Sequence, residues 1–420
     1  MELPKRTKIN EGVYLHTLRV GHFKTNIINF NIQRPLTKEE VTYNALLPMI
    51  LERGTQSHPT SKAISDSLDY LYGASFNTNV DKKGERQIIQ FSLMLANDQF
   101  VEESVFEKGL VLLNEIIHGP FLENGAFKKE YVNQEKKNLQ DRISGRINDK
   151  MSYSLERCAE EMCKEEPFHI FPQGEIEDLE GIDETKLYKH YKKVMETSPI
   201  DIVVVGDIQH EKIVKMIKDT FKFNRKTVLE NEREKVNFEV NKVNEVEENM
   251  EINQGKLTLG YRTNIPYEEA GYAALMVYSS ILGGGAHSKL FLKVREEKSL
   301  CYYIFSQLEK FKSLMLISSG IEEAQYGETI KAVENQLKEM ESGNISDMQM
   351  EHGKKAVITN LESLRDSSNG LANFILSQSL SQTNETINTM IEKIRGVAKA
   401  DVVEVAEKIE LDTIYFLKKA

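Results

Sequence analysis

The segment from residue 281 to residue 303 constrains the fold of this chain more than any other. An apolar run ends at Ile281-Leu282, three glycines follow at 283–285, and a mixed stretch at 288–297 leads into apolar residues from 301 onward. Glycine commonly ends helices, because it adopts backbone conformations that other residues avoid. The pattern therefore predicts a helix that ends at the glycines, a second helix over 288–297, and then a strand.

This segment places Arg295 and Tyr302 on either side of the predicted helix-to-strand turn. Arginine is always charged and tyrosine offers one directional donor, so the pair is suited to hold one carbonyl oxygen. Peptide hydrolysis places negative charge on that oxygen, and donors aimed at it lower the barrier. From spacing alone a structural role is simpler, because a cation is favourable near a helix C-terminus and an alternating strand buries its tyrosines.

Gly283, Gly284 and Gly285 do not have the pattern of a phosphate-binding loop. The chain contains no Gly-x-x-x-x-Gly-Lys-Ser/Thr, and the run follows a helix instead of a strand. It also contains no Gly-x-Ser-x-Gly and no motif that pairs a cysteine with a histidine. We expect the glycines to end one helix and to let the backbone pass close to another element or to a substrate.

Length and charge narrow the class of protein. A chain of 420 residues exceeds what one hydrophobic core usually organises, so two or more domains are expected. A hydrophobic content of 40% with 28% charged residues is typical of a globular protein and too apolar for a disordered one. The formal net charge of −11 provides no basic field for a phosphate backbone, so nucleic acid is not expected as a partner.

The cysteines and the N-terminal residues indicate the cellular compartment of the protein. Three cysteines at unremarkable spacing do not form a disulfide framework and fit a reducing compartment. The N-terminus runs into charged residues without an apolar leader, and no run approaches the roughly 20 apolar residues of a membrane span. We expect a cytoplasmic protein without a membrane partner.

Periodic patterns indicate alternating strands and helices. Thr37 stands three residues before Glu40, the spacing of a capping box, and opens a predicted helix that ends near Gly54. A long, strongly charged helical pattern fills 124–163. Further strands are predicted at 12–18, 25–32, 87–95, 200–207, 256–262, 301–308 and 313–321, and further helices from 61 and 104, over 210–222 and 267–282, and as two long helices over 326–364.

These elements divide into two similar halves and predict an α+β fold. Residues 226–250 are rich in Lys, Glu, Asn and Val and contain no glycine or proline, which favours a solvated linker. The predicted organisation is an N-terminal domain over 1–225, a charged linker over 226–250, and a C-terminal domain over 251–420 that carries Arg295 and Tyr302.

Residues 282–296 read Leu-Gly-Gly-Gly-x-x-Ser-x-Leu-Phe-x-x-x-Arg-Glu, and this run resembles the C-terminal half of the pitrilysin/insulinase-type metallopeptidases, or inverzincins. The resemblance covers nearly the whole chain and is strongest at 36–80, 200–222 and 254–305. It implies paired α+β domains, each a mainly antiparallel sheet backed by helices. In that family an Arg and a Tyr seven residues apart hold substrate opposite the zinc, which implies this role for Arg295 and Tyr302.

The zinc motif of that family, His-x-x-Glu-His, is missing. A zinc site of this kind needs two histidines one helical turn apart and a glutamate that activates water. No two histidines of this chain are three or four residues apart; they are His16, His22, His58, His118, His169, His190, His210, His287 and His352. The Gly-Thr pair at 54–55 sets the register of the resemblance, which puts Ala45 and Met49 at the histidine positions and Pro48 at the glutamate.

The resemblance puts Arg142 at the family's third zinc ligand, where a guanidinium would repel a dication. We expect no cofactor in this chain. Ala45, Met49 and their apolar neighbours are interpreted as a helix face packed in the core, and Glu135 and Asp141 as a solvated surface. Because proline lacks an N–H and clashes with the preceding turn, Pro48 predicts a helix that kinks or ends early.

Three functions remain open. The first is a non-catalytic, substrate-side subunit of a two-chain zinc peptidase, in which a homologous partner with an intact His-x-x-Glu-His supplies the zinc and Arg295 and Tyr302 hold the peptide. The second is an inert scaffold or peptide-binding protein of the same fold, acting in peptide maturation or modification. The third is a stand-alone hydrolase with unrecognised ligands, which the missing motif makes the weakest of the three.

Overall fold

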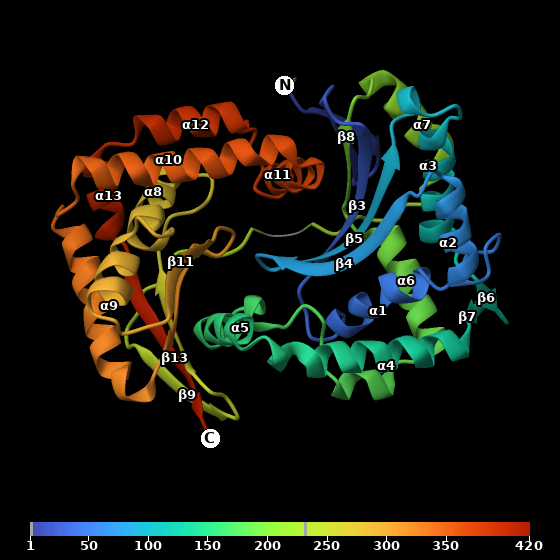
Figure 1. Ribbon diagram of the computed structural model, residues 1–420. Helices are drawn as coiled ribbons and strands as arrows, with labels where there is room; N and C mark the ends of the chain where they lie inside the picture. The colour runs from blue at the N-terminus through green and yellow to red at the C-terminus, as the bar shows by residue number, and fades with distance from the viewer. Residues whose placement is uncertain (1–2, 231–232) are drawn as a thin grey trace. The chain divides into compact units, whose positions relative to one another are not determined.

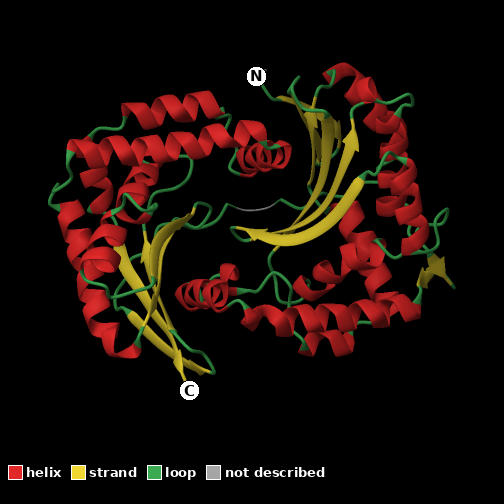
Figure 2. Ribbon diagram, viewed as in Figure 1, coloured by secondary structure: helices red, strands yellow, loops and turns green. Residues whose placement is uncertain are grey.

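The computed structural model describes residues 3–230 and 233–420, which form two units. Unit 1 contains Met1–Gly145, Ile170–Glu232 and Leu364–Gln382, and unit 2 contains Arg146–His169, Arg233–Ser363 and Thr383–Ala420. Each unit has one mixed, mainly antiparallel sheet flanked by helices (Figure 2). The predicted α+β fold is confirmed.

Unit 1 is built on a six-stranded sheet with the strand order β1-β2-β8-β3-β5-β4, in which only β2 and β8 are parallel (Figure 1). The strands are β1 (Lys5–Asn10), β2 (Val13–Arg19), β3 (Thr25–Pro35), β4 (Ser75–Lys83), β5 (Arg86–Ala96) and β8 (Ile200–Gly206). Its helices are α1 (Val41–Leu51), α2 (Ser61–Tyr70), α3 (Val105–His118), α4 (Lys129–Gly145), α6 (Glu184–Thr197), α7 (His210–Thr220) and α11 (Ser368–Leu380). A two-stranded hairpin, β6 (Leu122–Glu123) and β7 (Ala126–Phe127), precedes α4.

Unit 2 is built on a five-stranded sheet with the order β11-β12-β10-β13-β9, in which only β13 and β9 are parallel. The strands are β9 (Asn244–Met250), β10 (Gly255–Arg262), β11 (Tyr303–Glu309), β12 (Leu314–Ile321) and β13 (Glu410–Lys419). The helices are α5 (Lys150–Met162), α8 (Tyr272–Gly283), a π-helix (Phe291–Glu297), α9 (Tyr326–Glu341), α10 (Asp347–Ser363), α12 (Ile387–Gly396) and α13 (Lys399–Ala406).

The two faces of the unit 1 sheet differ in character. Along β3, Ile28, Phe30 and Ile32 alternate with polar residues, so one face is apolar and packs in a large core with α1, α3, α6 and α7. The opposite face presents Asn29, Asn31 and Gln33, which are also buried. Helix α11 packs on this polar face, against β8 and β3.

Hydrogen bonds to Asp201 help to fix α11 on this face, which also contains the buried Ile27, Val203 and Val205. The carboxylate of Asp201 is buried on β8 and accepts from Gln33 Nε2 at 2.6 Å and from Ser379 Oγ of α11 at 2.8 Å, and it also pairs with His16 Nε2 at 2.6 Å. Burial alone would raise the pKa of Asp201, but the bonds from His16, Ser379 and Gln33 outweigh it and lower that pKa. Buried polar groups need such partners, so this face specifies where α11 lies.

Helix α5 covers one face of the unit 2 sheet. Met162 and Cys158 pack in one apolar cluster with Leu316 of β12 and Tyr415 of β13. A Cβ at Gly260 of β10 would lie 2.2 Å from Met162 Sδ, so a larger residue there would displace that side chain. Ser154 and Thr258 add a hydroxyl pair at 2.7 Å.

The long helical pattern over 124–163 forms two separate helices, α4 and α5, which belong to different units. The helical pattern breaks at 146–149, where Asp149 caps α5: its Oδ1 accepts the N–H groups of Met151 and Ser152, both at 3.1 Å. Of the predicted linker 226–250, residues 231 and 232 lie outside the described residues, and 244–250 form β9. That domain division stays a prediction.

The predicted capping box at the start of α1 is wrong. Helix α1 begins at Val41 and receives no side-chain cap. The Glu40 carboxylate instead pairs with the buried Arg34 and with Lys193 Nζ at 2.5 Å, so it is not available to the backbone. Of the two outcomes predicted at Pro48, the early end is wrong, because α1 continues to Leu51, and the kink stays a prediction.

Two half-buried histidines of unit 1 predict a loss of stability in mild acid. Burial lowers the pKa of His118 and of His190 to about 4 in the folded chain, whereas an unfolded histidine titrates near 6.5. The folded state therefore favours the neutral ring. This stabilisation is complete above about pH 6.5 and is lost as pH falls toward 4, by on the order of 3 kcal/mol per histidine.

Chemical denaturation followed between pH 7 and pH 4 measures this loss. His118→Gln is expected to flatten the pH dependence of the unfolding free energy. His22→Gln removes an exposed histidine as the matched control and is expected to leave it unchanged. Equal slopes for His118→Gln and the parent chain would contradict the assignment.

Candidate functional site

The glycine run ends α8 where that helix meets β11. A Cβ at Gly283 would lie 2.5 Å from the backbone nitrogen of Ser306, which cannot move aside as a side chain can. Next to this contact the hydroxyls of Ser279 and Ser306 are 2.9 Å apart. Gly285 has a φ of 140°, a conformation that other residues rarely adopt. The predicted helix stop at Gly283, Gly284 and Gly285 is confirmed, and a contact between the run and a substrate stays a prediction.

A tight turn joins the π-helix to β11. Ser299 has a φ of 54°, and its N–H donates to the carbonyl of Arg295 at 3.1 Å. The N–H of Leu300 donates to the carbonyl of Val294 at 3.0 Å, and both of these side chains are buried. Tyr302 then joins the sheet through its N–H, which donates to Gly320 O of β12 at 2.9 Å. The turn is therefore fixed at both ends by backbone bonds and buried side chains.

The two predicted substrate-side residues lie at the two ends of this turn, and both are accessible. The Arg295 guanidinium lies over the Phe291 ring, 4.6 Å from its centroid, and 3.5 Å from a carboxylate oxygen of Glu296. Its side chain is 38% exposed, so both contacts are surface contacts of low strength. Tyr302 is 64% exposed, and its hydroxyl makes no hydrogen bond to any residue that the structure describes.

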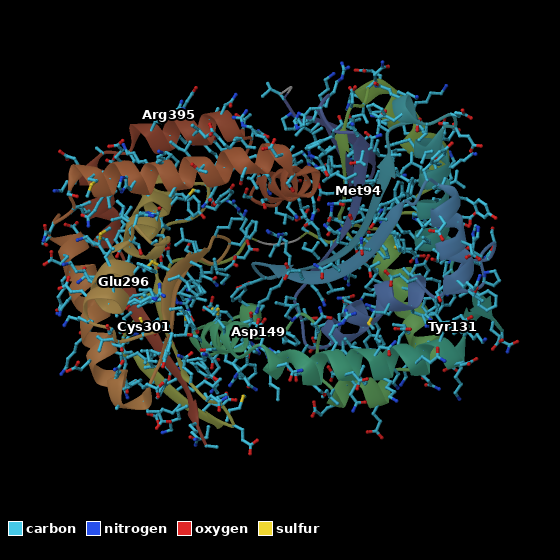
Figure 3. All side chains as sticks on the ribbon, in the orientation of Figure 1. Met94, Tyr131, Asp149, Glu296, Cys301 and Arg395 are labelled. Carbon is cyan, nitrogen blue, oxygen red and sulfur yellow. The ribbon has the colours of Figure 1, made fainter. Side chains whose placement is uncertain are left out.

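Cys301 shows that the Arg295 charge extends to the start of β11. Burial raises the pKa of the Cys301 thiol to about 11, and the positive charge of Arg295 acts in the opposite direction. Glu296 and Cys301, which flank the turn, are labelled in Figure 3. A buried thiol with this pKa is protonated near neutral pH and is not a nucleophile. Cys301 therefore adds no catalytic group to this turn.

Helix α1 has no group that binds zinc at the three expected positions. Ala45 and Met49 are 0% and 7% exposed and belong to the main core of unit 1, and Pro48 is also buried. The predicted packing of this helix face in the core is confirmed. Alanine and proline side chains contain no ligand atom and a thioether is a poor zinc ligand, so these residues do not fit the metal.

The buried charged residue of helix α4 next to the end of α1 is Glu135, and not Arg142. Arg142 is exposed. Glu135 is 5% exposed and lies 3.4 Å from Nη1 of Arg53, so its predicted place on a solvated surface is wrong. Burial raises the pKa of the neighbouring Glu52, and the Glu135 charge adds to that shift.

The spacing of apolar residues in α4 contains the signal for Glu135 that our sequence analysis missed. Val132, Glu135 and Leu139 are the buried residues of this helix, and their spacing of three and four marks one helical face. Because lysines flank Glu135 in the sequence, the charge pattern alone suggests that this helix face is exposed.

In the described ranges, 3–230 and 233–420, no three His, Cys, Asp or Glu side chains are placed to hold a metal ion. We predict that the purified chain retains no stoichiometric zinc, because Ala45, Pro48 and Met49 provide no ligands. Elemental analysis after dialysis against a weak chelator measures the metal content. One zinc per chain that survives this treatment would refute the prediction.

Within the described ranges, no helix is both long and apolar enough to cross a membrane.

Comparison with known proteins identifies related sequences. A family model described as peptidase M16 inactive domain matches residues 181–357. The chain is 39% identical over 411 residues to the probable inactive metalloprotease YmfF of Bacillus subtilis, a match that covers 97% of this chain and 96% of the relative.

Two crystal structures show the same fold. A conserved protein from Enterococcus faecalis superimposes with a TM-score of 0.90 at 26% identity, covering 100% of this chain and 99% of that one. A peptidase M16 inactive domain from Pseudomonas fluorescens gives a TM-score of 0.81 at 14% identity, covering 99% and 98% of the two chains.

Proposed function

The chain belongs to the M16 peptidase family, the pitrilysin/insulinase-type metallopeptidases, and we propose that it is the non-catalytic, substrate-side subunit of a two-chain zinc peptidase. In this proposal a homologous partner with an intact His-x-x-Glu-His holds the zinc and activates water, and this chain binds the peptide. The similarity to a relative named a probable inactive metalloprotease supports a non-catalytic role.

The exposure of Tyr302 carries the proposal. A tyrosine kept for packing alone would be buried, as Tyr261, Tyr278 and Tyr415 are in the same unit. Tyr302 is instead 64% exposed at a turn that the backbone fixes, and Arg295 is partly exposed at the other end of that turn. We infer that both side chains donate hydrogen bonds to one carbonyl oxygen of the bound peptide and stabilise its negative charge in the transition state.

Arg295 and Tyr302 are suited to substrate binding rather than to proton transfer. A guanidinium stays protonated at any pH that the protein encounters, so it holds an anion without acting as a base. Because neither group activates water, cleavage needs the partner's zinc site. No step of the reaction passes through a metal held by this chain.

The test is reconstitution. The chain is mixed with a homologue that contains His-x-x-Glu-His, and peptide turnover is measured for each chain alone and for the mixture. We expect this chain alone to be inactive and the mixture to be active, with a complex of both chains in size-exclusion chromatography. A stable complex with no gain in turnover would contradict a substrate-side role and favour the scaffold.

The scaffold alternative has one observation in its favour. Arg295 already stacks on Phe291 and contacts Glu296, which is what a residue that only stabilises the π-helix would do.

For the cellular location we propose the cytoplasm, because the three cysteines are all free and buried, as expected in a reducing compartment.

A further inference from the structure

A cavity of about 180 Å³ lies at one end of the unit 1 sheet, and none of the residues discussed for peptidase chemistry lines it. It forms where β2, β3, β5 and β8 begin or end against the neighbouring helices α3 and α7. Four apolar side chains line it: Phe106, Ile208 and Ile213, which are buried, and Met216, which is half-buried. The remaining lining residues are polar, so a bound molecule would meet both apolar surface and hydrogen-bonding groups.

The carboxylates that line the cavity already have donors. Asp207 accepts from Arg19 Nε at 2.9 Å and from Gln99 Nε2 at 3.1 Å. Asp98 accepts from the N–H of Phe106 at 3.0 Å and from Ser104 Oγ at 3.3 Å. The hydrogen bonds from Arg19 and Gln99 also lower the pKa of Asp207. Both carboxylates therefore already have partners within the chain, Arg19 and Gln99 for one and the start of α3 for the other.

Several donors at the cavity have no partner among the described residues. Asn26 is 3% exposed; its Oδ1 accepts from Asn97 at 3.4 Å, while its Nδ2 donates to no described residue. Lys212 has no ion pair or hydrogen bond in the described ranges. Helix α7 begins at His210, and its N-cap residue Gln209 makes no side-chain cap, so the positive end of the helix dipole also faces this region.

We propose that this cavity binds a small apolar carboxylate, the chemistry shared by the C-terminal residue of a peptide and a free N-acylated amino acid. In this proposal Asn26 Nδ2 and the Lys212 ammonium bind the carboxylate, and the four apolar side chains that line the cavity contact the side chain of the ligand. The volume is below the roughly 300–1,000 Å³ of common ligand pockets, so it accommodates one residue and not a longer segment. The proposal is independent of the Arg295 and Tyr302 site.

Calorimetric titration of the full chain with N-acetyl-leucine and with its neutral amide tests the charge requirement. The carboxylate is expected to bind about tenfold or more tightly than the amide, because a hydrogen bond to a charged group is lost. Lys212→Met is expected to remove this preference. Lys215→Met is the matched control, because Lys215 is also exposed on α7 but does not line the cavity, and it is expected to keep the preference.

A second measurement locates the site and distinguishes the two sources of the ligand. In a chain with labelled methionine methyl groups, the Met216 signal, assigned with Met216→Leu, is expected to shift with the carboxylate. A short peptide with a free C-terminus is compared with its amidated form and with N-acetyl-leucine, and a shift with either carboxylate supports the proposal. Equal binding of acid and amide, no binding of any carboxylate, or an unshifted Met216 signal would overturn it.

Discussion

Arg295→Ala or Tyr302→Phe is expected to lower peptide turnover by the reconstituted pair about a hundredfold to a thousandfold. Each change removes one donor to the carbonyl oxygen that becomes negative in the transition state. Because these donors act mainly in the transition state, kcat is expected to fall more than KM rises. Both side chains are partly exposed, so the variants are expected to fold and to assemble with the partner.

The matched control for this pair is Lys298→Ala, which removes an exposed cation from the same turn. It is expected to retain parental turnover. Assembly is followed separately by size-exclusion chromatography, so that a loss of activity is not confused with a loss of binding. If both site variants assemble and turn over peptide at the parental rate, Arg295 and Tyr302 are structural and the scaffold function replaces our proposal.

Lys312→Met is expected to lower the unfolding free energy of unit 2 by about 3 to 5 kcal/mol. Lys312 is 0% exposed, and its Nζ lies 2.6 Å from Oε2 of Glu166, whose Oε1 accepts from Arg262 Nη2 at 2.7 Å. Burial would raise the pKa of Glu166, but the bonds from Arg262 and Lys312 lower it. Removing the lysine leaves the buried Glu166 carboxylate with one cation. This loss lowers the unfolding free energy by more than the intact ion pair adds to it.

Urea unfolding of the whole chain measures this change, with the transition of unit 2 followed separately because two units need not unfold together. Lys338→Met removes an exposed lysine of the same unit and is expected to change stability by at most about 0.5 kcal/mol. The double variant Glu166→Gln with Lys312→Met is expected to be less destabilised than the sum of the single variants, because neither partner is left alone. Additive single effects would show that the two residues do not act as a pair.

Local periodicity was enough to predict most strands and helices but not which sheet a helix covers. The strand predicted at 25–32 lies within β3, whose alternating residues place Ile28, Phe30 and Ile32 in the core. The break between α4 and α5 has local signals, Gly145 and the capping Asp149, but a charged pattern on both sides hides it. The assignment of α5 to the unit 2 sheet rests on Gly260 and Thr258, which are about a hundred residues away, so no local pattern contains it.

The candidate site was predictable in part. The spacing of Arg295 and Tyr302 and the apolar residues at the zinc positions are visible in the chain itself. The exposure of Tyr302 was not, because an alternating strand normally buries its aromatic residues and the neighbouring elements decide which of them stay accessible. The burial of Glu135 depends in the same way on its pairing with Arg53, which lies 82 residues earlier in the chain.

The position of α11 has a consequence for the order in which a growing chain folds. The sheet of unit 1 is complete once β8 has been made, but the helix that covers its polar face ends only at Leu380. Because a ribosome synthesises about 5 to 20 residues per second, that face stays uncovered for on the order of 10 s before its helix has been made. An apolar face would be prone to aggregate during this delay. A face that presents His16, Asn31 and Asp201 can remain hydrated until Ser379 has been synthesised and α11 packs on the sheet.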